Sequence, residues 1–336
     1  MRLLICTQNV DENDPLLGFF HGWIIELAKH FEHITVLALR SGEKSLPGNV
    51  EVVTLGGSFR FQKVFEICAI AIGRRKEYDA VFVHMSQEFV LAGGLIWGLL
   101  RKPVYLWHNH YVGSIFTHIA AALSKKVFCT SRYAYSARFK KTTVMPVGID
   151  LALFKPVSGV ERIPHSILFF GRLMPSKRPE LLLEALSVLH KRGVEFSATL
   201  CGPGERAYMD HLQKKAQELG VANRVAFRGG ISNQEAPRIY SSHEIFVNLS
   251  SSGMFDKTLF EAAACGCAVL AVSKDFSEQT KLPALAEDPV GIAETLQKEL
   301  ERGGDEISKR ASHLKEIIEA QGITVLGKRL AQELRI

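Results

Sequence analysis

The chain has 336 residues, of which 47% are hydrophobic and 23% charged, a composition typical of folded globular proteins and not of disordered ones. The length suits two domains of roughly 150 residues each. The longest apolar stretch, 90–100, has 11 residues, whereas a membrane-spanning helix needs about 20. The first residues lack the apolar run of a secretory signal, so we expect a cytoplasmic protein.

The whole excess of positive charge lies in the first half of the chain. The net charge is +6; residues 1–155 hold 18 Lys and Arg against 12 Asp and Glu, whereas residues 156–336 hold 23 of each. A basic half can meet nucleic acid, an anionic membrane or an acidic substrate. No nucleic-acid-binding motif accompanies the charge. We therefore expect no nucleic acid partner, and an anionic membrane surface, on the inner face of the cytoplasmic membrane, is the favoured partner.

Short apolar runs alternate with amphipathic ones along the whole chain. In the first half the pattern predicts helices at about 19–30, 60–77, 87–100 and 112–123. It predicts strands at 2–7, 34–39, 50–55, 80–85, 103–108 and 126–131. Such alternation is typical of a parallel sheet with helices on both faces.

Residues 144–165, rich in proline and glycine, separate this series from a second one. The second series begins with the strand SILFFG at 166 and ends with AVLAVS at 268–273. We therefore predict the α/β class, with two doubly wound, Rossmann-like domains at 1–155 and 156–321 facing each other across a cleft. Ligands of such sheets bind at the carboxyl ends of the strands.

The loop after the first strand of the second domain has the features of an anion site. Its sequence GRLMPSKRPE opens a helix, with Ser176 and Pro179 as start signals. A helix start presents unpaired N–H groups to an anion, and Arg172 and Lys177 add two cations without a nearby carboxylate before Glu180. This outlines a phosphate or diphosphate site; the alternative is a pair of solvated loop cations.

Glu261 stands within an otherwise apolar, helix-like segment. A buried carboxylate is costly unless a partner pairs with it. A carboxylate can accept two hydrogen bonds at once, as the acidic residue of nucleotide-binding folds does from a ribose. Together with the two cations, Glu261 indicates a nucleotide diphosphate ligand.

The segments GRLMPSKRPELLLEAL, CGPGERAYMDHL, VAFRGGISNQEAPRIYSSHEIFVNLS and FDKTLFEAAACGCAVLA follow one another in this order. The series resembles the donor domain of family 4 glycosyltransferases, which have the GT-B fold. The first half is similar to that family too, at ICTQNVDENDPLLGFFHGWIIELAKHF and at KVFCTSRYAYSARFKKTTVMPVGIDLALFKP. The likeness covers nearly the whole chain.

The resemblance implies a retaining glycosyltransferase that moves a sugar from a nucleotide diphosphate sugar, such as a UDP or GDP sugar, to a glycan or lipid-linked acceptor. It implies neither metal nor cofactor, which agrees with the absence of an Asp-x-Asp triplet. The first domain would bind the acceptor and the second the donor, and residues 322–336 would form a helix that crosses back to the first domain. The implied donor-binding residues are Gly18, Gly171, Arg172, Lys177, Gly253, Met254, Phe255, Asp256 and Glu261.

In this correspondence Arg172 and Lys177 hold the diphosphate and act in catalysis, Gly18 lies near the diphosphate, and Glu261 holds the ribose as the second glutamate of an E-x7-E motif. The position of the first glutamate is Gly253, which departs from the family. Its role would pass to backbone N–H groups of residues 251–254 or to Asp256. Asp256 is also a good N-cap for the helix that follows.

His108 and His110 follow a strand end, where an active cleft is expected. No Asp, Glu or Cys stands nearby to complete a metal set, so we expect no metal there. In the family a histidine after this strand contacts the transferred sugar, and His110 aligns best, with His108 second. A histidine without a catalytic role is the alternative.

The segment FRFQKVFEICAIAIGRRKEYD, residues 59–79, carries aromatic and aliphatic residues at helical spacing with cations near both ends. Such a face is most often core, and that is our first expectation. A basic helix with an apolar face can also lie on an anionic membrane.

Two other functions fit parts of the sequence. A nucleotide-sugar-binding protein without turnover would explain the loss of a carboxylate at Gly253. A dinucleotide-dependent oxidoreductase would suit the sheet, but the loop after the first strand has one glycine and no GxGxxG pattern.

Overall fold

The computed structural model describes residues 1–253, 256–302 and 313–335. The chain divides into two compact units. Unit 1 comprises Met1–Gly148 and Ile323–Ile336, and unit 2 comprises Ile149–Gly322. The boundary after Gly148 lies seven residues before the boundary at 155 predicted from the sequence. The last helix belongs to the same unit as the start of the chain.

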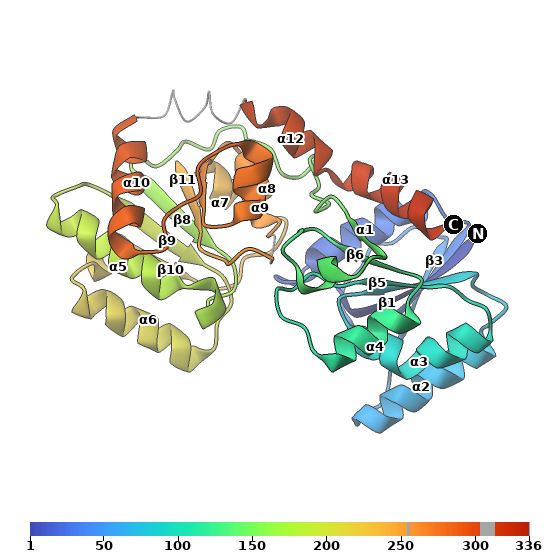
Figure 1. Cartoon of the computed structure of the whole chain (residues 1–336). Coiled ribbons are helices and arrows are strands. Elements are labelled where there is room, and N and C mark those ends of the chain that lie inside the picture. The colour runs from blue at the N-terminus through green and yellow to red at the C-terminus, as the bar shows by residue number, and fades with distance from the viewer. Residues whose placement is uncertain (254–255, 303–312, 336) are drawn as a thin grey trace. The chain divides into compact units, whose positions relative to one another are not determined.

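Unit 1 contains a parallel sheet of seven strands in the order β3-β2-β1-β4-β5-β6-β7 (Figure 1). Alternate side chains of a strand point to opposite faces, so Leu3 and Ile5 enter one core and Leu4 and Cys6 the other. Both faces are covered by helices, as expected for strands with little polar sequence. The strands are β1 (Arg2–Val10), β2 (His33–Ser41), β3 (Val50–Thr54), β4 (Ala80–His84), β5 (Val104–Trp107), β6 (Lys126–Cys129) and β7 (Thr142–Val144).

Two sets of helices cover this sheet. The first core lies under α1 (Gly18–Ala28) and α13 (Ile323–Leu334). The second lies under α2 (Arg60–Gly73), α3 (Gln87–Leu99) and α4 (Ile115–Leu123). A 3-10 turn, η1 (Tyr135–Arg138), precedes β7.

The final helix is an integral part of unit 1. Leu326, Leu330 and Leu334 of α13 are buried against α1. The indole Nε1 of Trp23, on α1, donates a hydrogen bond of 2.9 Å to the carbonyl of Gly148. This bond fixes the end of the first passage of the chain through unit 1.

Unit 2 contains a parallel sheet of five strands in the order β10-β9-β8-β11-β12. Its core joins the strands to α5, α6 and α10. The strands are β8 (Ser166–Phe170), β9 (Ser197–Cys201), β10 (Val225–Arg228), β11 (Ile245–Asn248) and β12 (Ala268–Ala271). The helical segments are η2 (Pro175–Lys177), α5 (Pro179–Lys191), α6 (Arg206–Glu218), η3 (Ala222–Arg224), α7 (Ala236–Ser241), α8 (Thr258–Ala264), α9 (Lys274–Thr280), α10 (Pro289–Arg302) and α12 (Lys315–Ala320).

The predicted fold class, two doubly wound parallel sheets, is confirmed. Ser232 and Glu235, which precede α7, hydrogen-bond to each other through side chains and backbone in the manner of a capping box. The short strand β7 was missed. None of the six cysteines, which all lie within the described residues, forms a disulfide, and all but Cys68 are buried. Within the described residues, no helix combines the length and apolarity that crossing a bilayer requires.

Candidate functional site

The strand order of unit 2 reverses between β8 and β11. From β8 the chain runs outward through β9 and β10, then returns to place β11 and β12 on the other side. The loops that leave β8 and β11 therefore diverge and leave a crevice at the carboxyl ends of these strands, which is where ligands of open α/β sheets bind. Most of the predicted donor-binding residues belong to these two loops.

Lys177, from the β8 loop, meets the β11 loop at this point. Its Nζ lies 2.8 and 2.7 Å from the two carboxylate oxygens of Asp256 and 3.1 Å from Ser250 Oγ. Asp256 also accepts hydrogen bonds from Ser250 Oγ (2.6 Å) and Asn248 Nδ2 (3.1 Å). Burial alone would raise the pKa of Asp256, but the Lys177 ammonium and these hydrogen bonds lower it. The carboxylate is therefore held ionised.

This cluster corrects two sequence predictions. Lys177 is paired with a carboxylate that lies 79 residues further along the chain. Asp256 does not cap α8, because its carboxylate binds Lys177 and the helix start receives no side-chain capping bond. The sequence analysis overlooked Asn248 and Ser250, two polar residues at the end of an apolar strand, although that position alone could have identified them.

Arg172 is exposed, and neither a hydrogen bond nor an ion pair joins it to another described residue. It follows Gly171, whose carbonyl oxygen passes so close to Gly202 that a Cβ on Gly202 would collide with it. Gly202 has φ +144°, a conformation that favours glycine. The close approach of these two loops sets the direction in which the backbone leaves β8 toward Arg172.

Of the two predicted start signals of α5, Pro179 is confirmed and Ser176 is not. Ser176 lies inside the 3-10 turn η2, so it does not begin the helix. Arg178 follows with φ +59° and α5 begins at Pro179. The guanidinium of Arg178 pairs with Glu287 at 2.7 Å. Of the three cations of this loop, Lys177 and Arg178 are paired with carboxylates, whereas Arg172 has no partner among the described residues.

Glu261 has partners within the chain. Its side chain is 5% exposed, its Oε1 lies 2.8 Å from Lys257 Nζ, one helical turn away, and its Oε2 accepts a hydrogen bond of 3.3 Å from the hydroxyl of Tyr240. Burial and the neighbouring Glu261 carboxylate raise the pKa of Tyr240, so the hydroxyl stays a donor. A carboxylate offers about four acceptor positions, so two remain for hydroxyl groups of a ligand.

Gly253 occupies a backbone conformation that explains the missing carboxylate. Its φ is +92°, which side-chain-bearing residues rarely adopt. It is buried, and its N–H donates a 3.2 Å hydrogen bond to Asp275 Oδ2. This N–H, which the sequence analysis offered as a sugar ligand, is therefore already engaged. Met254 and Phe255 lie outside the described residues.

Unit 1 has its own switch point, between β1 and β4. Gln8 Nε2 donates to Ser86 Oγ across it at 2.8 Å, and Met85 adopts φ +63°, a strained conformation that is common at functional sites. Gly18, which the resemblance places near the diphosphate, is the first residue of α1 and follows the loop after β1. A Cβ there would come within 2.9 Å of the Glu12 carbonyl oxygen, so the loop's own packing requires glycine.

The two predicted histidines differ in environment. His110 is half-buried, and its Nδ1 lies 3.0 Å from the backbone nitrogen of Val112 and 3.1 Å from the carbonyl oxygen of the same residue. His108 is buried; burial, with His110 nearby, lowers its pKa. Its Nδ1 and the hydroxyl of Thr130, which follow neighbouring strands, have no partner among the described residues. Both atoms are buried.

Residues 164–302 match the family model of the glycosyl transferases group 1. This stretch contains Arg172, Lys177 and Glu261. The chain is 33% identical over 138 residues to D-inositol 3-phosphate glycosyltransferase of Mycolicibacterium gilvum, covering 39% of this chain and 31% of that protein. It is 30% identical over 147 residues to mannosylfructose-phosphate synthase of Agrobacterium fabrum, covering 39% and 32%. The matches span about a third of these relatives.

Two solved structures are similar over the whole chain. Anabaena HepE in complex with UDP and glucose has a TM-score of 0.80 and 19% identity, covering 100% of this chain and 99% of that chain. WaaG, a glycosyltransferase involved in lipopolysaccharide biosynthesis, has a TM-score of 0.68 and 16% identity, covering 99% of each. The chain therefore has the two-domain α/β fold of these proteins.

Proposed function

We propose that this protein is a glycosyltransferase that moves a sugar from a nucleotide diphosphate sugar to a glycan or lipid-linked acceptor. One observation carries the proposal: Lys177 and Asp256 meet at the switch point of unit 2, within the stretch that matches the family model. We include in the proposal a UDP or GDP sugar as donor, retention of configuration and independence from metal, as the resemblance implies.

The diphosphate binds at Arg172 and Lys177. When the bond between the anomeric carbon and the diphosphate oxygen breaks, negative charge grows on the diphosphate, and fixed cations lower the energy of that state. The acceptor hydroxyl oxygen forms the new bond to the anomeric carbon. The leaving oxygen takes the hydroxyl proton, so no protein carboxylate is required as base.

The remaining residues orient the donor. Glu261 accepts hydrogen bonds from the ribose with the acceptor positions that Lys257 and Tyr240 leave open. Gly253 contributes no carboxylate to the sugar. The resemblance also implies that His110 contacts the transferred sugar. Lys177 binds the diphosphate while its ammonium stays hydrogen-bonded to Asp256. This bond limits the directions in which the ammonium can point.

Thermal unfolding with a panel of nucleoside diphosphates and their sugars tests the donor site. A ligand at 100 times its Kd stabilises the native state by about 2.7 kcal/mol. We expect a shift with one or two diphosphates that Arg172→Ala and Glu261→Gln each reduce. Arg206→Ala is the matched control, because Arg206 is an exposed arginine of unit 2 on α6. If no diphosphate shifts the transition, the donor site is wrong.

Turnover tests the chemistry separately. With the donor that binds best, Arg172→Ala and Lys177→Ala should each lower the rate of sugar transfer at least tenfold, which corresponds to about 1.4 kcal/mol or more. Rates near those of the unmodified protein would contradict the roles of these residues. Binding without consumption of the donor, across a range of glycan and lipid-linked acceptors, would favour a nucleotide-sugar-binding protein.

A further inference from the structure

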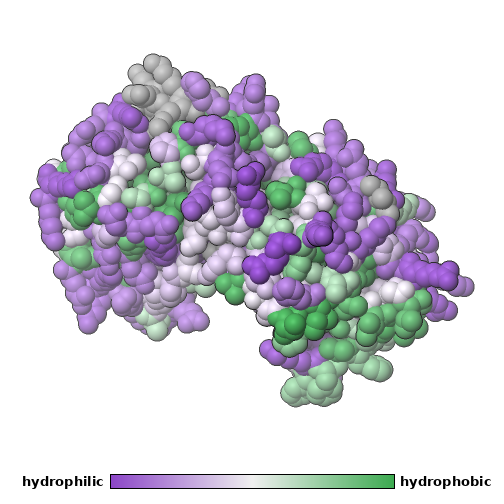
Figure 2. Space-filling model, viewed as in Figure 1, coloured by the Kyte–Doolittle hydropathy of each residue, from purple (hydrophilic) through white to green (hydrophobic). Residues whose placement is uncertain are grey.

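The helices α2, α3 and α4 expose an unusual number of large apolar side chains. These helices pack side by side on one face of the unit 1 sheet, and Figure 2 shows hydrophobic colour concentrated over them. We call this set the apolar face. Its members are Phe59, Phe61, Val64, Phe65, Ile72, Leu95, Leu99, Ile115, Phe116 and Ile119.

The expectation that residues 59–79 form a core helix is wrong for most of α2. Within the helix, Ile67 and Ala71 are buried against the sheet. Phe61 and Phe65, one turn apart, are 72% and 75% exposed, and Leu99 of the neighbouring helix is 85% exposed. Three side chains of this size cost free energy in water, at roughly 25 cal/mol for each Å² of apolar surface, so the face is suited to a partner.

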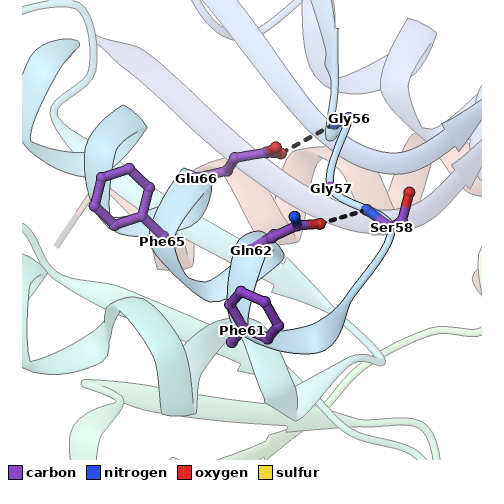
Figure 3. A pocket seen from close by; sticks show the side chains of 7 residues that line it. All are labelled: Gly56, Gly57, Ser58, Phe61, Gln62, Phe65 and Glu66. Carbon is purple, nitrogen blue, oxygen red and sulfur yellow. Dashed lines mark hydrogen bonds between the residues drawn. The ribbon is translucent and has the colours of Figure 1, made fainter.

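Two polar side chains of α2 hold the loop that precedes the helix. Gln62 Oε1 accepts hydrogen bonds from the N–H groups of Ser58 and Phe59, and Glu66 Oε2 accepts one from Gly56 (Figure 3). These bonds tie the preceding loop to the first turns of α2. A cavity of about 580 Å³ lies there, lined by Phe61 and Phe65 among others. The two aromatic residues that line it are largely exposed.

The stretch of chain that contains the apolar face is rich in cations. Residues 56–145 hold 13 Lys and Arg against 4 Asp and Glu. Three of the four carboxylates are engaged, Glu66 by Gly56, Glu77 by Arg74 and Asp79 by Arg2. At the start of α2, neither the side chain of Arg60 nor that of Lys63 forms a hydrogen bond or ion pair with a described residue. An anionic partner is therefore favoured over a neutral one.

We propose that the apolar face binds the surface of an anionic phospholipid bilayer, with Phe61 and Phe65 inserted among the lipids and Arg60 and Lys63 at the phosphate level. A bilayer surface offers both chemistries over a wide area, apolar chains beneath anionic headgroups. An amphipathic helix of this kind lies in the interface with its apolar side about 5–10 Å deep. Each cation near an anionic surface contributes about 1 kcal/mol, roughly a fivefold effect. The inference does not depend on the donor site.

Flotation with vesicles tests the proposal. The full chain is mixed with vesicles of phosphatidylcholine alone or of two parts phosphatidylcholine to one part phosphatidylglycerol. We expect binding to the anionic vesicles, with loss of binding in about 1 M salt, where the Debye length falls to about 3 Å. Binding that is equal on the two vesicles, or absent from both at low salt, overturns the proposal.

Variants separate the apolar and the charged contributions. Phe61→Ser with Phe65→Ser, and Arg60→Glu with Lys63→Glu, should each weaken binding at least tenfold. Lys191→Glu with Arg206→Glu is the matched control, since both are exposed cations of unit 2 and the change in net charge is the same. Far-ultraviolet circular dichroism and tryptophan fluorescence, which reports unit 1, are followed together during urea unfolding to confirm that the variants fold. If the phenylalanine pair instead abolishes a dimer of the chain and leaves vesicle binding intact, a second copy is the partner and the proposal fails.

Discussion

The ion pair between Lys177 and Asp256 should contribute measurably to the stability of unit 2. Breaking a fully buried pair by removing one partner costs about 3–5 kcal/mol, since the other charge stays buried. Here the side chains are 13% and 22% exposed, and Asp256 would keep its hydrogen bonds from Ser250 and Asn248. We therefore expect Lys177→Met to lower the free energy of unfolding by about 2 kcal/mol.

A double-mutant cycle isolates the pair. Lys177→Met, Asp256→Asn and the double variant should give an interaction energy of about 1.5 kcal/mol, within the range for residues that share a hydrogen-bond network. The three tryptophans, Trp23, Trp97 and Trp107, all lie in unit 1. Urea unfolding is therefore followed by far-ultraviolet circular dichroism, which senses unit 2, and by tryptophan fluorescence, which reports unit 1.

The matched control is the pair Lys214–Glu218 on α6, at 3.7 Å with side chains 76% and 63% exposed. Exposed pairs at this helical spacing contribute about 0.3–0.5 kcal/mol, so Lys214→Met should have little effect. An interaction energy at Lys177 and Asp256 no larger than that of the exposed pair would refute the reasoning, because the carboxylate would then be solvated rather than held by the lysine.

Two further predictions concern acid and the backbone. Burial lowers the pKa of His243, so the folded state binds a proton there less readily than the unfolded state. The free energy of unfolding therefore keeps its full value above the ordinary pKa of about 6.5. It falls as the pH drops below that value, by at most about 1.4 kcal/mol per pH unit. Urea unfolding between pH 7 and 5 should show this slope, His243→Asn should reduce it, and a flat profile for the unmodified protein would contradict it. Gly253→Ala should cost about 1–3 kcal/mol because its φ is +92°, whereas Gly229→Ala, at an exposed glycine with open space around it, should change stability by less than about 0.5 kcal/mol. Equal effects at the two glycines in the same assay would remove the backbone explanation.

The sequence predicts most of the fold because the alternation of apolar and amphipathic segments is strong. Each predicted strand from 2–7 to 268–273 has a counterpart, with ends that differ by a few residues. The missed strand β7, Thr142–Val144, has three residues and pairs at the edge with β6. An edge strand of that length carries no alternation that a sequence pattern could reveal.

The partners of the candidate site residues were predictable only where they are local. Lys257 stands four residues before Glu261, a spacing that brings side chains together on any helix, whereas Tyr240 is 21 residues away. Asp256 reaches Lys177 across 79 residues because β8 and β11 are neighbours in the sheet. That adjacency depends on the strand order, which local sequence does not specify. For residues 59–79 the sequence left core and membrane surface open, since helical spacing does not say which apolar side of α2 faces the sheet.

The pairing of Lys177 changes what each cation of the donor loop contributes to binding a diphosphate. Lys177 already interacts with Asp256, so its contribution to affinity is the difference between its interaction with the ligand and its interaction with that carboxylate. Arg172 has no partner among the described residues, and its attraction for an anion is not reduced in this way. The two substitutions to alanine should therefore rank in opposite orders: Arg172→Ala weakens diphosphate binding more, and Lys177→Ala lowers stability without ligand more. If Lys177→Ala were the more damaging in both assays, Asp256 would have to release the lysine when the ligand binds.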